Sequence, residues 1–584
     1  MSDFSINKLR AMDSEKVRVG VFVCHCGSNI GGVVDVPAVA EYARTLPHVV
    51  HAEDNLYSCS EGGLSSLKQS IREQRLNRVV VASCTPRTHE PLFKNACEEA
   101  GLNRYLFEFV NIREHCSWIH SRAKEAATEK AKRLVNMGVA KACLLEPQQE
   151  AESKVTPAAL VIGGGVAGMT SALNLARQGF RVHLVEKETQ LGGRLLHIHR
   201  LCPTDEDALG LIEPLVQEAE GHERITLHMP ATVMAVSGYV GNFQVTVEDE
   251  CTFDVGTIIV ATGAGVLQPL GLCGYGQYTN VLTQLELEER FKTAPPEVEG
   301  AVLINCVGAR IPERPYCSRV CCMTSLKNAV QLKEQNPEAH VYVLHRDLLT
   351  QGVEFERYYR QARKAGVRFL RYELEHPPQV VGDGSTGLAE TVVVWDALRG
   401  RELRLPVDLV ALSTPLVPGA DNEAVSRLLK VPLGESGFFL EAHVKLQPVE
   451  FATDGIYVCA TARWPADVSE SITQAYAASS KASIPMRAGV VTAEAITAFS
   501  DPSRCTGCGT CVITCPYNAI EMQISSTQSP IPNTQYPIPN ISHVNVVQCK
   551  GCGSCVAACP NGAMQQRGLT DQQVLRMIEV CASG

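Results

Sequence analysis

Two cysteine runs near the end of the chain have the spacing of iron–sulfur ligands. They read CTGCGTCVITCP and CKGCGSCVAACP, each with three cysteines separated by two residues, a fourth after three more, and a proline. Three thiolates at this spacing wrap one face of a 4Fe–4S cube, and the fourth cysteine usually ligates the other cube. We therefore expect one cluster on Cys505, Cys508, Cys511 and Cys559 and another on Cys549, Cys552, Cys555 and Cys515. Zinc is the alternative, which two complete copies of the run disfavour.

A glycine-rich turn in the middle of the chain predicts a nucleotide site. Gly163, Gly165 and Gly168 form the pattern GxGxxG between the apolar strand AALVI and the helical stretch MTSALNLARQG. The first glycine permits the tight bend, the second lets a pyrophosphate approach the backbone, and the third brings helix and strand together. Glu186 ends the next strand, where its carboxylate can accept hydrogen bonds from a ribose. A glycine turn without a ligand is the alternative.

The sequence after this turn indicates FAD rather than NAD. Gly192-Gly193-Arg194 and the ATG at 261–263 resemble stretches of FAD-dependent disulfide reductases of the thioredoxin reductase type. The candidate FAD-binding residues are Gly163, Gly165, Gly168, Glu186, Lys187, Gly193, Arg194, Thr262 and Gly263.

A third cysteine group stands where that class of flavoprotein binds NAD(P)H through a second glycine loop. The strand AVLINCVGAR is present, but cysteines follow it in ERPYCSRVCC in place of the glycines. The nicotinamide site is therefore expected to be absent, and a third 4Fe–4S cluster to lie near the flavin. Its predicted ligands are Cys306, Cys317, Cys321 and Cys322. A redox disulfide is the alternative, but a bond between vicinal cysteines would be strained.

Lys327 is the candidate catalytic residue. It lies five residues beyond Cys322, on the helix expected to follow the third cluster. An ammonium directed at the isoalloxazine would stabilise negative charge on the reduced flavin. The alternative is a lysine that is merely solvated on a helix surface.

Alternating strand and helix patterns place these groups in α/β domains. The N-terminal pattern predicts a small doubly wound parallel sheet. The predicted parts are an N-terminal α/β domain at 14–146, a two-lobed thioredoxin-reductase-like FAD domain at 155–495 with its second lobe at about 299–445, a two-cluster ferredoxin domain at 496–565 and a helical tail at 566–584. The proline-rich stretch 526–540 is expected to be an exposed excursion of the ferredoxin domain.

The composition excludes several other classes of protein. The 584 residues, 45% of them hydrophobic and 20% charged, are enough for several folded domains. A net charge of -10 leaves no basic field for nucleic acid or an anionic membrane. No apolar run would span a membrane and the first residues lack the core of a signal peptide, so we expect a cytoplasmic protein. The 24 cysteines then indicate thiolates held for metals or redox chemistry.

Taken together, these motifs resemble the HdrA family, the A-type subunits of heterodisulfide reductase. The resemblance covers nearly the whole chain and rests on CHCGSNI (24–30), VVVASCTPRTHEPLF (79–93), CSWIH (116–120), the FAD fingerprint, ERPYCSRVCC and the ferredoxin runs. It implies an iron–sulfur flavoprotein whose FAD splits or collects electrons in a larger complex, including flavin-based electron bifurcation. It also implies that the four cysteines from Cys306 to Cys322 hold a cluster and that Lys327 lies at the flavin.

The resemblance further implies partner proteins. These are subunits of the B and C type, where a disulfide would be reduced, a hydrogenase or formate dehydrogenase that supplies electrons, and a second copy of the chain in a homo-oligomer. Fuller members of the family carry a further ferredoxin insertion in the FAD domain. Here TVMAVSGYVGNFQVTVED runs on to TIIVATGA without cysteine runs, so one electron route is absent.

The N-terminal domain carries candidates for a fourth cluster. Cys24, Cys59 and Cys84 fall at or just beyond predicted strands, and Cys116 follows the strand YLFEFVNI, with Cys26 as a spare ligand. Because the carboxyl ends of parallel strands share one edge, these thiols can converge in one crevice. The crevice would hold a cluster or dock the cluster of a partner. Buried structural cysteines are the alternative.

Two other functions stay open. A self-contained NAD(P)H-dependent oxidoreductase resembling glutamate synthase small subunits would need a second dinucleotide fingerprint, which the sequence lacks. A structural scaffold with vestigial cofactors would show no change in its visible spectrum on reduction.

Overall fold

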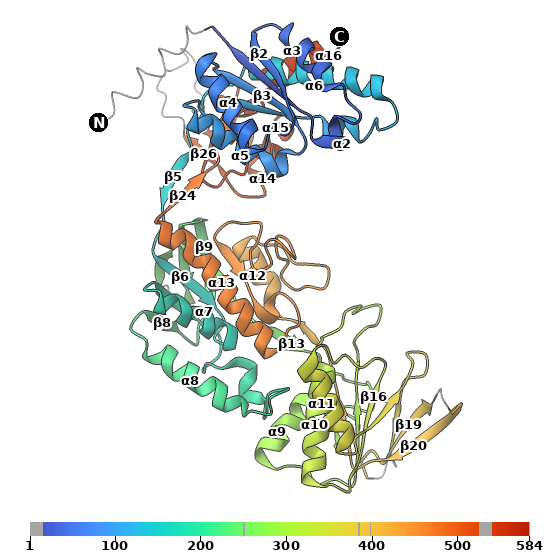
Figure 1. Cartoon of the computed structure of the whole chain (residues 1–584). Helices are drawn as coiled ribbons and strands as arrows, with labels where there is room; N and C mark the ends of the chain where they lie inside the picture. Colours follow the sequence, from blue (N-terminus) through green and yellow to red (C-terminus); the bar gives the residue numbers. More distant parts are fainter. Residues whose placement is uncertain (1–15, 249–250, 383–385, 397–398, 525–539, 583–584) are drawn as a thin grey trace. The chain divides into compact units, whose positions relative to one another are not determined.

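The computed structural model of the protein describes residues 16–248, 251–382, 386–396, 399–524 and 540–582. The chain divides into two compact units (Figure 1). Unit 1 combines Met1–Glu152 with Thr492–Gly584, and unit 2 spans Ser153–Val491. The N-terminal and ferredoxin domains, expected as separate parts, therefore pack into one unit. The proline-rich excursion expected at 526–540 lies, apart from its last residue, outside the described residues.

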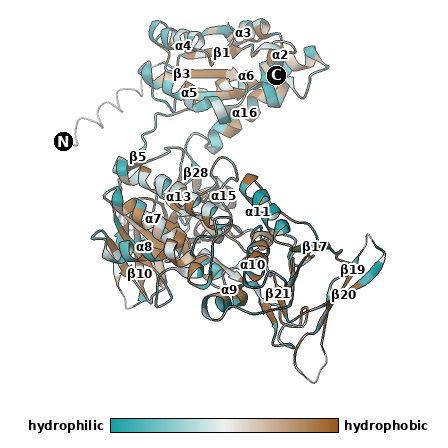
Figure 2. Ribbon diagram, turned by 60° about the horizontal axis from the view of Figure 1, so that its bottom comes forward, coloured by the Kyte–Doolittle hydropathy of each residue, from teal (hydrophilic) through white to brown (hydrophobic). Residues whose placement is uncertain are grey.

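The N-terminal part of unit 1 is a four-stranded parallel sheet, in the order β2-β1-β3-β4, covered by helices. Its strands are β1 (Val19–Cys24), β2 (Val49–Asn55), β3 (Arg78–Ser83) and β4 (Phe107–Asn111), and its helices are α2 (Gly27–Ile30), α3 (Val36–Arg44), α4 (Glu61–Glu73), α5 (Pro86–Glu99), η2 (Arg113–Ser117) and α6 (Lys124–Ala142). The strand β1 is buried throughout, and β3 is buried from Val79 onward (Figure 2). Two helix pairs, α3 with α6 and α4 with α5, cover the sheet, which confirms the doubly wound prediction.

The ferredoxin part of unit 1 consists of two short antiparallel sheets of two strands each and two helices. The helices α14 and α15 pack against each other, β25 pairs with β28, and β26 pairs with β27. The elements are β25 (Ala498–Ser500), α14 (Thr510–Thr514), β26 (Ile520–Ile524), β27 (Asn540–Val544), α15 (Ser554–Ala558) and β28 (Met564–Gln566). Its small core contains Cys511 and Cys555 beside apolar residues, so the cysteine runs themselves form much of the interior.

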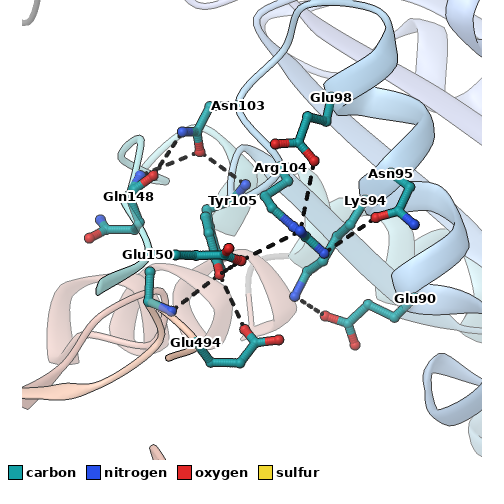
Figure 3. Close-up of polar contacts among 11 residues, drawn as sticks. Glu90, Lys94, Asn95, Glu98, Asn103, Arg104, Tyr105, Gln148, Glu150 and Glu494 are labelled. Atoms are coloured by element: carbon teal, nitrogen blue, oxygen red, sulfur yellow. Dashed lines mark hydrogen bonds and ion pairs between the residues drawn. The ribbon is translucent and has the colours of Figure 1, made fainter. Parts of the chain in front are cut away.

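Two attachments fasten the ferredoxin part to the N-terminal sheet within unit 1. The tail helix α16 (Asp571–Ala582) lies along α6, where Gln573 donates to the carbonyl oxygen of Leu144 at 2.8 Å (Figure 1). At the other attachment, the Tyr105 hydroxyl donates to Glu150 at 2.7 Å and accepts from the backbone N–H of Ala495 at 3.2 Å (Figure 3). Burial raises the pKa of Tyr105, so this hydroxyl stays protonated.

The first lobe of unit 2 is a parallel sheet in the order β23-β12-β6-β7-β8, flanked by the antiparallel sheet β11-β10-β9. The helix that follows the glycine turn, α7, packs along α13. The strands are β6 (Ala158–Ile162), β7 (Arg181–Val185), β8 (Ile225–His228), β9 (Val233–Tyr239), β10 (Asn242–Val247), β11 (Thr252–Val255), β12 (Thr257–Val260) and β23 (Ile456–Val458). The helices are α7 (Val166–Arg177), η3 (Gly193–His197), α8 (Ala208–Gly221), α12 (Asn422–Leu429), η5 (Ala460–Ala462) and α13 (Val468–Ala488).

The second lobe repeats this plan with the parallel order β14-β21-β15-β16-β17 and an antiparallel sheet β18-β19-β20. The strands are β14 (Val281–Thr283), β15 (Gly300–Ile304), β16 (His340–His345), β17 (Arg368–Arg371), β18 (Gln379–Val381), β19 (Thr391–Asp396), β20 (Arg401–Pro406) and β21 (Leu409–Leu412). The helices are α9 (Gln284–Thr293), α10 (Cys321–Gln335) and α11 (Val353–Lys364). Where the chain passes between the lobes, β13 (Ala264–Val266) pairs with β22 (Leu416–Pro418).

The chain passes between the units twice, through β5 (Ala151–Lys154) and β24 (Val490–Ala493), and these two strands pair with each other. Unit 2 is therefore an insertion within unit 1. Among the described residues, the helices are all too short or too polar to cross a membrane.

Replacing Tyr105 by phenylalanine tests the attachment at Ala495. The change removes the hydroxyl and leaves the N–H of Ala495 without its acceptor, so the local free energy of unfolding should fall by about 1–3 kcal/mol. Amide hydrogen exchange around Ala495 measures the loss as faster exchange. The control is Tyr42→Phe, because Tyr42 lies on α3 and its ring faces the Lys132 ammonium instead of Ala495. Equal exchange in both variants would contradict the attachment.

Candidate cofactor sites

The eight ferredoxin cysteines line two hollows in unit 1. One hollow is lined by Cys505, Cys508, Cys511 and Cys559. The other is lined by Cys515, Cys549, Cys552 and Cys555. Each hollow thus combines three cysteines of one run with the fourth of the other. Among the described residues, no His, Cys, Asp or Glu trio is arranged to hold a single metal ion. Thiols set around open space fit a body of several atoms, such as an iron–sulfur cube.

The two cysteine runs fold alike because each contains a glycine in the left-handed region. Gly509 (φ 76°) and Gly553 (φ 78°) turn the chain into α14 and α15, and those helices end at Cys515 and Cys559. The backbone N–H of Ala519 donates to the Cys515 sulfur at 3.3 Å, and that of Met564 donates to the Cys559 sulfur at 3.5 Å. These bonds fix the two sulfurs that cross to the other run.

The glycine turn after β6 leaves room for a ligand at one glycine only. A Cβ added to Gly168 would lie 1.7 Å from the carbonyl oxygen of Gly163, and one added to Gly163 would lie 2.4 Å from that of Ala261. A Cβ added to Gly165 would meet no atom within 4 Å. The backbone of Gly165 therefore faces open space at the start of α7, which fits the approach of a pyrophosphate to the N–H groups there.

Two polar side chains lie beside the turn, at the ends of the strands β7 and β12 that flank β6. Glu186 follows β7, and its carboxylate accepts a hydrogen bond from the N–H of Gly164 at 2.5 Å. Thr262 follows β12, and its buried hydroxyl has no hydrogen-bond partner among the described residues. Because buried hydroxyls are normally paired, the one at Thr262 fits a ligand that supplies the partner. The neighbouring Gly263 has a φ of 79°, so the chain turns at this strand end.

The remaining predicted FAD residues lie around the turn in different ways. A Cβ added to Gly193 would lie 3.1 Å from the Cα of Gly165, so this stretch packs on the turn. The Arg194 guanidinium donates to the carbonyl oxygen of Ala264, and burial lowers its pKa to about 10. The Lys187 ammonium is engaged elsewhere, in an ion pair with Asp421 at 3.0 Å.

The second lobe brings four cysteines together where β15 ends and α10 begins. Cys306 follows β15 with a φ of 61°, and Cys321 and Cys322 open α10. Burial raises the pKa of Cys306 and raises that of Cys322 to about 11, and the charge of nearby Cys317 adds to both effects. The charges of Cys306, Cys317 and Cys322 also reinforce the effect of burial at Cys321. Four neighbouring thiols that resist becoming anions fit a cationic iron centre.

Lys327 is buried in α10 rather than solvated. Its ammonium forms an ion pair with Glu288 of α9 and donates to the carbonyl oxygen of Arg200 at 2.6 Å. Lys327 is 3% exposed and Glu288 is 2% exposed, so the pair is withdrawn from water. The sequence predicts an ammonium directed at the isoalloxazine; in the structure it is held by these protein groups.

In the N-terminal sheet, the thiols of Cys24, Cys26, Cys59 and Cys84 are neighbours. Burial raises the pKa of Cys26 and Cys59, and the charges of Cys24 and Cys84 add to both shifts. The buried hydroxyl of Ser58 has no partner among the described residues, while the Ser58 N–H donates to the Cys24 sulfur at 3.4 Å.

Cys116 does not join this group, contrary to the expectation from the sequence. It lies in the π-helical turn η2, is fully buried, and its thiol donates to the carbonyl oxygen of Ala127 on α6 at 3.0 Å. Cys26, at the left-handed N-cap of α2 (φ 43°), is the fourth member of the thiol group instead. The strand before Cys116 ends at the expected edge of the sheet, but the π-helical turn directs the thiol inward.

Sequence reasoning missed the polar groups that stand beside the thiols. Ser58 directly precedes Cys59, and Asn305 directly precedes Cys306. Each has a buried polar atom without a partner among the described residues. Their position directly before a cysteine was the only signal available in the sequence.

Family models match two parts of the chain. Residues 504–563 match the 4Fe-4S dicluster domain, and residues 157–311 match the pyridine nucleotide-disulphide oxidoreductase domain. The second match covers the glycine turn and ends within the cysteine segment of the second lobe.

Relatives match almost the whole chain. The A-type subunit of the "H(2):CoB-CoM heterodisulfide,ferredoxin reductase" of Methanothermobacter marburgensis is 37% identical over 606 positions, covering 87% of this chain and 91% of the relative. An iron–sulfur subunit of the same type from the "CoB--CoM heterodisulfide reductase" of Methanopyrus kandleri is 38% identical, covering 88% and 92%. The corresponding subunit of the "H(2)/formate:CoB-CoM heterodisulfide,ferredoxin reductase" of Methanococcus maripaludis is 35% identical, covering 86% and 90%. Among solved structures, thioredoxin reductase from T. acidophilum aligns with 57% of this chain and 98% of its own at 17% identity, with a TM-score of 0.41.

Alanine substitutions at the glycine turn separate a ligand site from a structural turn. Gly165→Ala should fold normally and raise the Kd for FAD at least tenfold, about 1.4 kcal/mol, because its Cβ enters the open space beside α7. Gly168→Ala should fail to fold, since its Cβ would overlap a carbonyl oxygen. Flavin fluorescence titration of deflavinated protein measures the Kd, and Gly221→Ala on α8, which meets no atom within 4 Å, is the control. Unchanged affinity in Gly165→Ala would contradict this placement of the pyrophosphate.

Proposed function

The chain belongs to the HdrA family of heterodisulfide reductase subunits, and from this membership we propose that it is the electron-transferring flavin subunit of a heterodisulfide-reductase-like complex. It is an oxidoreductase with FAD and 4Fe–4S clusters. When bound, FAD accepts or gives electrons in pairs while iron–sulfur centres pass them singly, so the flavin is the junction.

The observation that carries this proposal is the thiol group of the second lobe. At the carboxyl end of β15, where the first lobe has a glycine turn, this lobe has Cys306 and the helix start with Cys321 and Cys322. These residues and Cys317 would hold a third 4Fe–4S cluster in place of a nicotinamide. Electrons rather than hydride then reach unit 2. In the first lobe, Gly165, Glu186 and Thr262 would hold the pyrophosphate, ribose and flavin portions of FAD.

The ferredoxin part would hold two clusters on crossed cysteine sets, and the N-terminal sheet a fourth on Cys24, Cys26, Cys59 and Cys84. The crossed lining of the two hollows supports the first assignment. The mutual proximity of the four N-terminal thiols supports the second. Lys327, paired with Glu288, would act on the flavin through the lobe interface rather than by direct contact.

The proposed partners are subunits of the B and C type, a hydrogenase or formate dehydrogenase, and a second copy of this chain. The relatives from M. marburgensis and M. maripaludis are named for hydrogen, formate, a heterodisulfide and ferredoxin, which supports these classes of donor and acceptor. Such a pair of acceptors also supports electron bifurcation at the flavin. All 24 cysteines are free, which supports a reducing cytoplasmic setting.

Mixing the anaerobic holoprotein with NADH tests the absence of a nicotinamide site. NADH should leave the flavin absorbance unchanged in a stopped-flow experiment, because thiols occupy the place of the second glycine loop. Dithionite should bleach the same sample, which controls for a competent flavin. Rapid bleaching by NADH would instead favour the self-contained NAD(P)H-dependent oxidoreductase.

Alanine variants of two cysteines test the fourth cluster. Cys26→Ala should lose the iron of one 4Fe–4S cluster per chain, whereas Cys116→Ala should keep all of it, because Cys116 bonds to α6 instead. Iron and acid-labile sulfide assays on anaerobically purified protein give the count. Full iron in Cys26→Ala, or a loss in Cys116→Ala, would reject the assignment.

A further inference from the structure

A buried amide donor without a partner lies one residue before Cys306 of the second-lobe thiol group. Asn305 is 0% exposed, follows β15 and directly precedes Cys306. Its Nδ2 has no hydrogen-bond partner among the described residues. Its backbone carbonyl oxygen accepts from the Tyr372 hydroxyl at 2.5 Å, so the residue is fixed on its main-chain side. A buried N–H group with nothing to donate to is costly and calls for a partner outside the protein chain.

Two serines and a glutamine hold the other end of the Asn305 amide. The Ser413 hydroxyl lies 2.8 Å from Asn305 Oδ1, and the Ser325 hydroxyl also bonds to this oxygen. Gln284 Nε2 lies 3.2 Å from both serine oxygens. The two serine hydroxyls also lie 2.7 Å from each other. Because Gln284 donates to both serine oxygens, at least one serine hydrogen remains for Asn305 Oδ1.

The chain of amides continues along α10 in the same direction. Asn328 Nδ2 donates to Gln284 Oε1 at 2.8 Å, and Gln331 Nε2 donates to Asn328 Oδ1 at 3.3 Å. Gln331 Oε1 lies 2.7 Å from His199 Nδ1, which then carries a hydrogen. Each side chain of this series donates a hydrogen bond to the next one toward Asn305. Asn305 Nδ2, at the end of the series, is a donor that has no acceptor among the described residues.

The same distances also fit the reverse direction of hydrogen bonding, in which the nitrogen and the oxygen of every side-chain amide exchange places. An oxygen rather than an N–H would then be the unpartnered atom beside Cys306. Sulfur ligands and sulfides are hydrogen-bond acceptors that carry negative charge, so they repel an oxygen and attract an N–H. A cluster at this site therefore selects the direction that ends in a donor.

We propose that Asn305 Nδ2 donates a hydrogen bond to a sulfur of the cluster held by Cys306, Cys317, Cys321 and Cys322, and that Gln284 is the positioning residue that aims it. This inference rests on the third cluster of the proposed function. The reduced cluster is the more negative, so it gains more from the donor than the oxidised one does. The hydrogen bond therefore raises the reduction potential of this cluster.

Three amide-to-carboxylate variants of the holoprotein test the proposal. Asn305→Asp removes the donor. Gln284→Glu acts at a distance: its carboxylate accepts from both serines, which then accept from Asn305 Nδ2 and turn it away from the cluster. Asn336→Asp is the matched control, because Asn336 caps the far end of α10 and donates to Val298 instead.

Redox titration followed by EPR measures the midpoint potential of each cluster, and the signal lost in Cys317→Ala identifies the one in question. That potential should fall in Asn305→Asp and Gln284→Glu and stay unchanged in Asn336→Asp. An exchangeable proton coupled to this cluster should disappear from the pulsed EPR spectrum of the first two variants.

The outcomes distinguish absence of the third cluster from absence of the Asn305 hydrogen bond. If Cys317→Ala keeps all iron and every EPR signal, the third cluster of the proposed function is refuted. If the cluster is present but its potential and proton coupling are the same in Asn305→Asp and Gln284→Glu as in the parent, the role of Asn305 alone is overturned.

Discussion

Four thiolates cannot share a small volume without a cation among them, and this constraint governs every irregular cysteine group of the chain. Burial raises the pKa values of Cys26, Cys59, Cys306 and Cys322, and their cysteine neighbours raise them further. Without a cation these thiols therefore stay protonated. Under the proposed function, iron would displace the protons on binding and would stabilise the fold, and the surrounding protein would orient the sulfurs and donate hydrogen bonds to them.

The two lobes of unit 2 share one sheet arrangement but carry different functional groups. The first lobe ends its central strand β6 in glycines, one of which leaves open space for a ligand, and the second ends β15 in a cysteine with a positive φ. In each lobe the functional atoms gather at the carboxyl ends of parallel strands, where loops can change without disturbing the sheet. At this edge the first lobe carries glycines and the second lobe carries cysteines.

A structural feature can be predicted from the sequence where the spacing of residues close together in the chain determines its geometry. The crossed cysteine sets of the ferredoxin part follow from two short runs that fold alike. The glycine turn follows from steric limits within a few residues. Both can therefore be predicted from the sequence. Cys116 fails because a π-helical turn rotates its thiol inward, which strand position alone does not reveal. The burial of Lys327 depends on Glu288 in another helix, and the joining of the N-terminal and ferredoxin parts depends on Tyr105 and α16. Those contacts join segments distant in sequence, and no periodicity records them.

The pairing of β5 with β24 makes the middle of the chain an insertion, and this arrangement orders events during synthesis. Unit 2 is continuous in sequence and leaves the ribosome before the second half of unit 1 exists. The N-terminal sheet is made before α16, so the surface of α6 that α16 covers stays bare until α16 has been made. Assembly of unit 1 thus waits for α16, and a chain that stops short of this helix displays an uncovered face of α6.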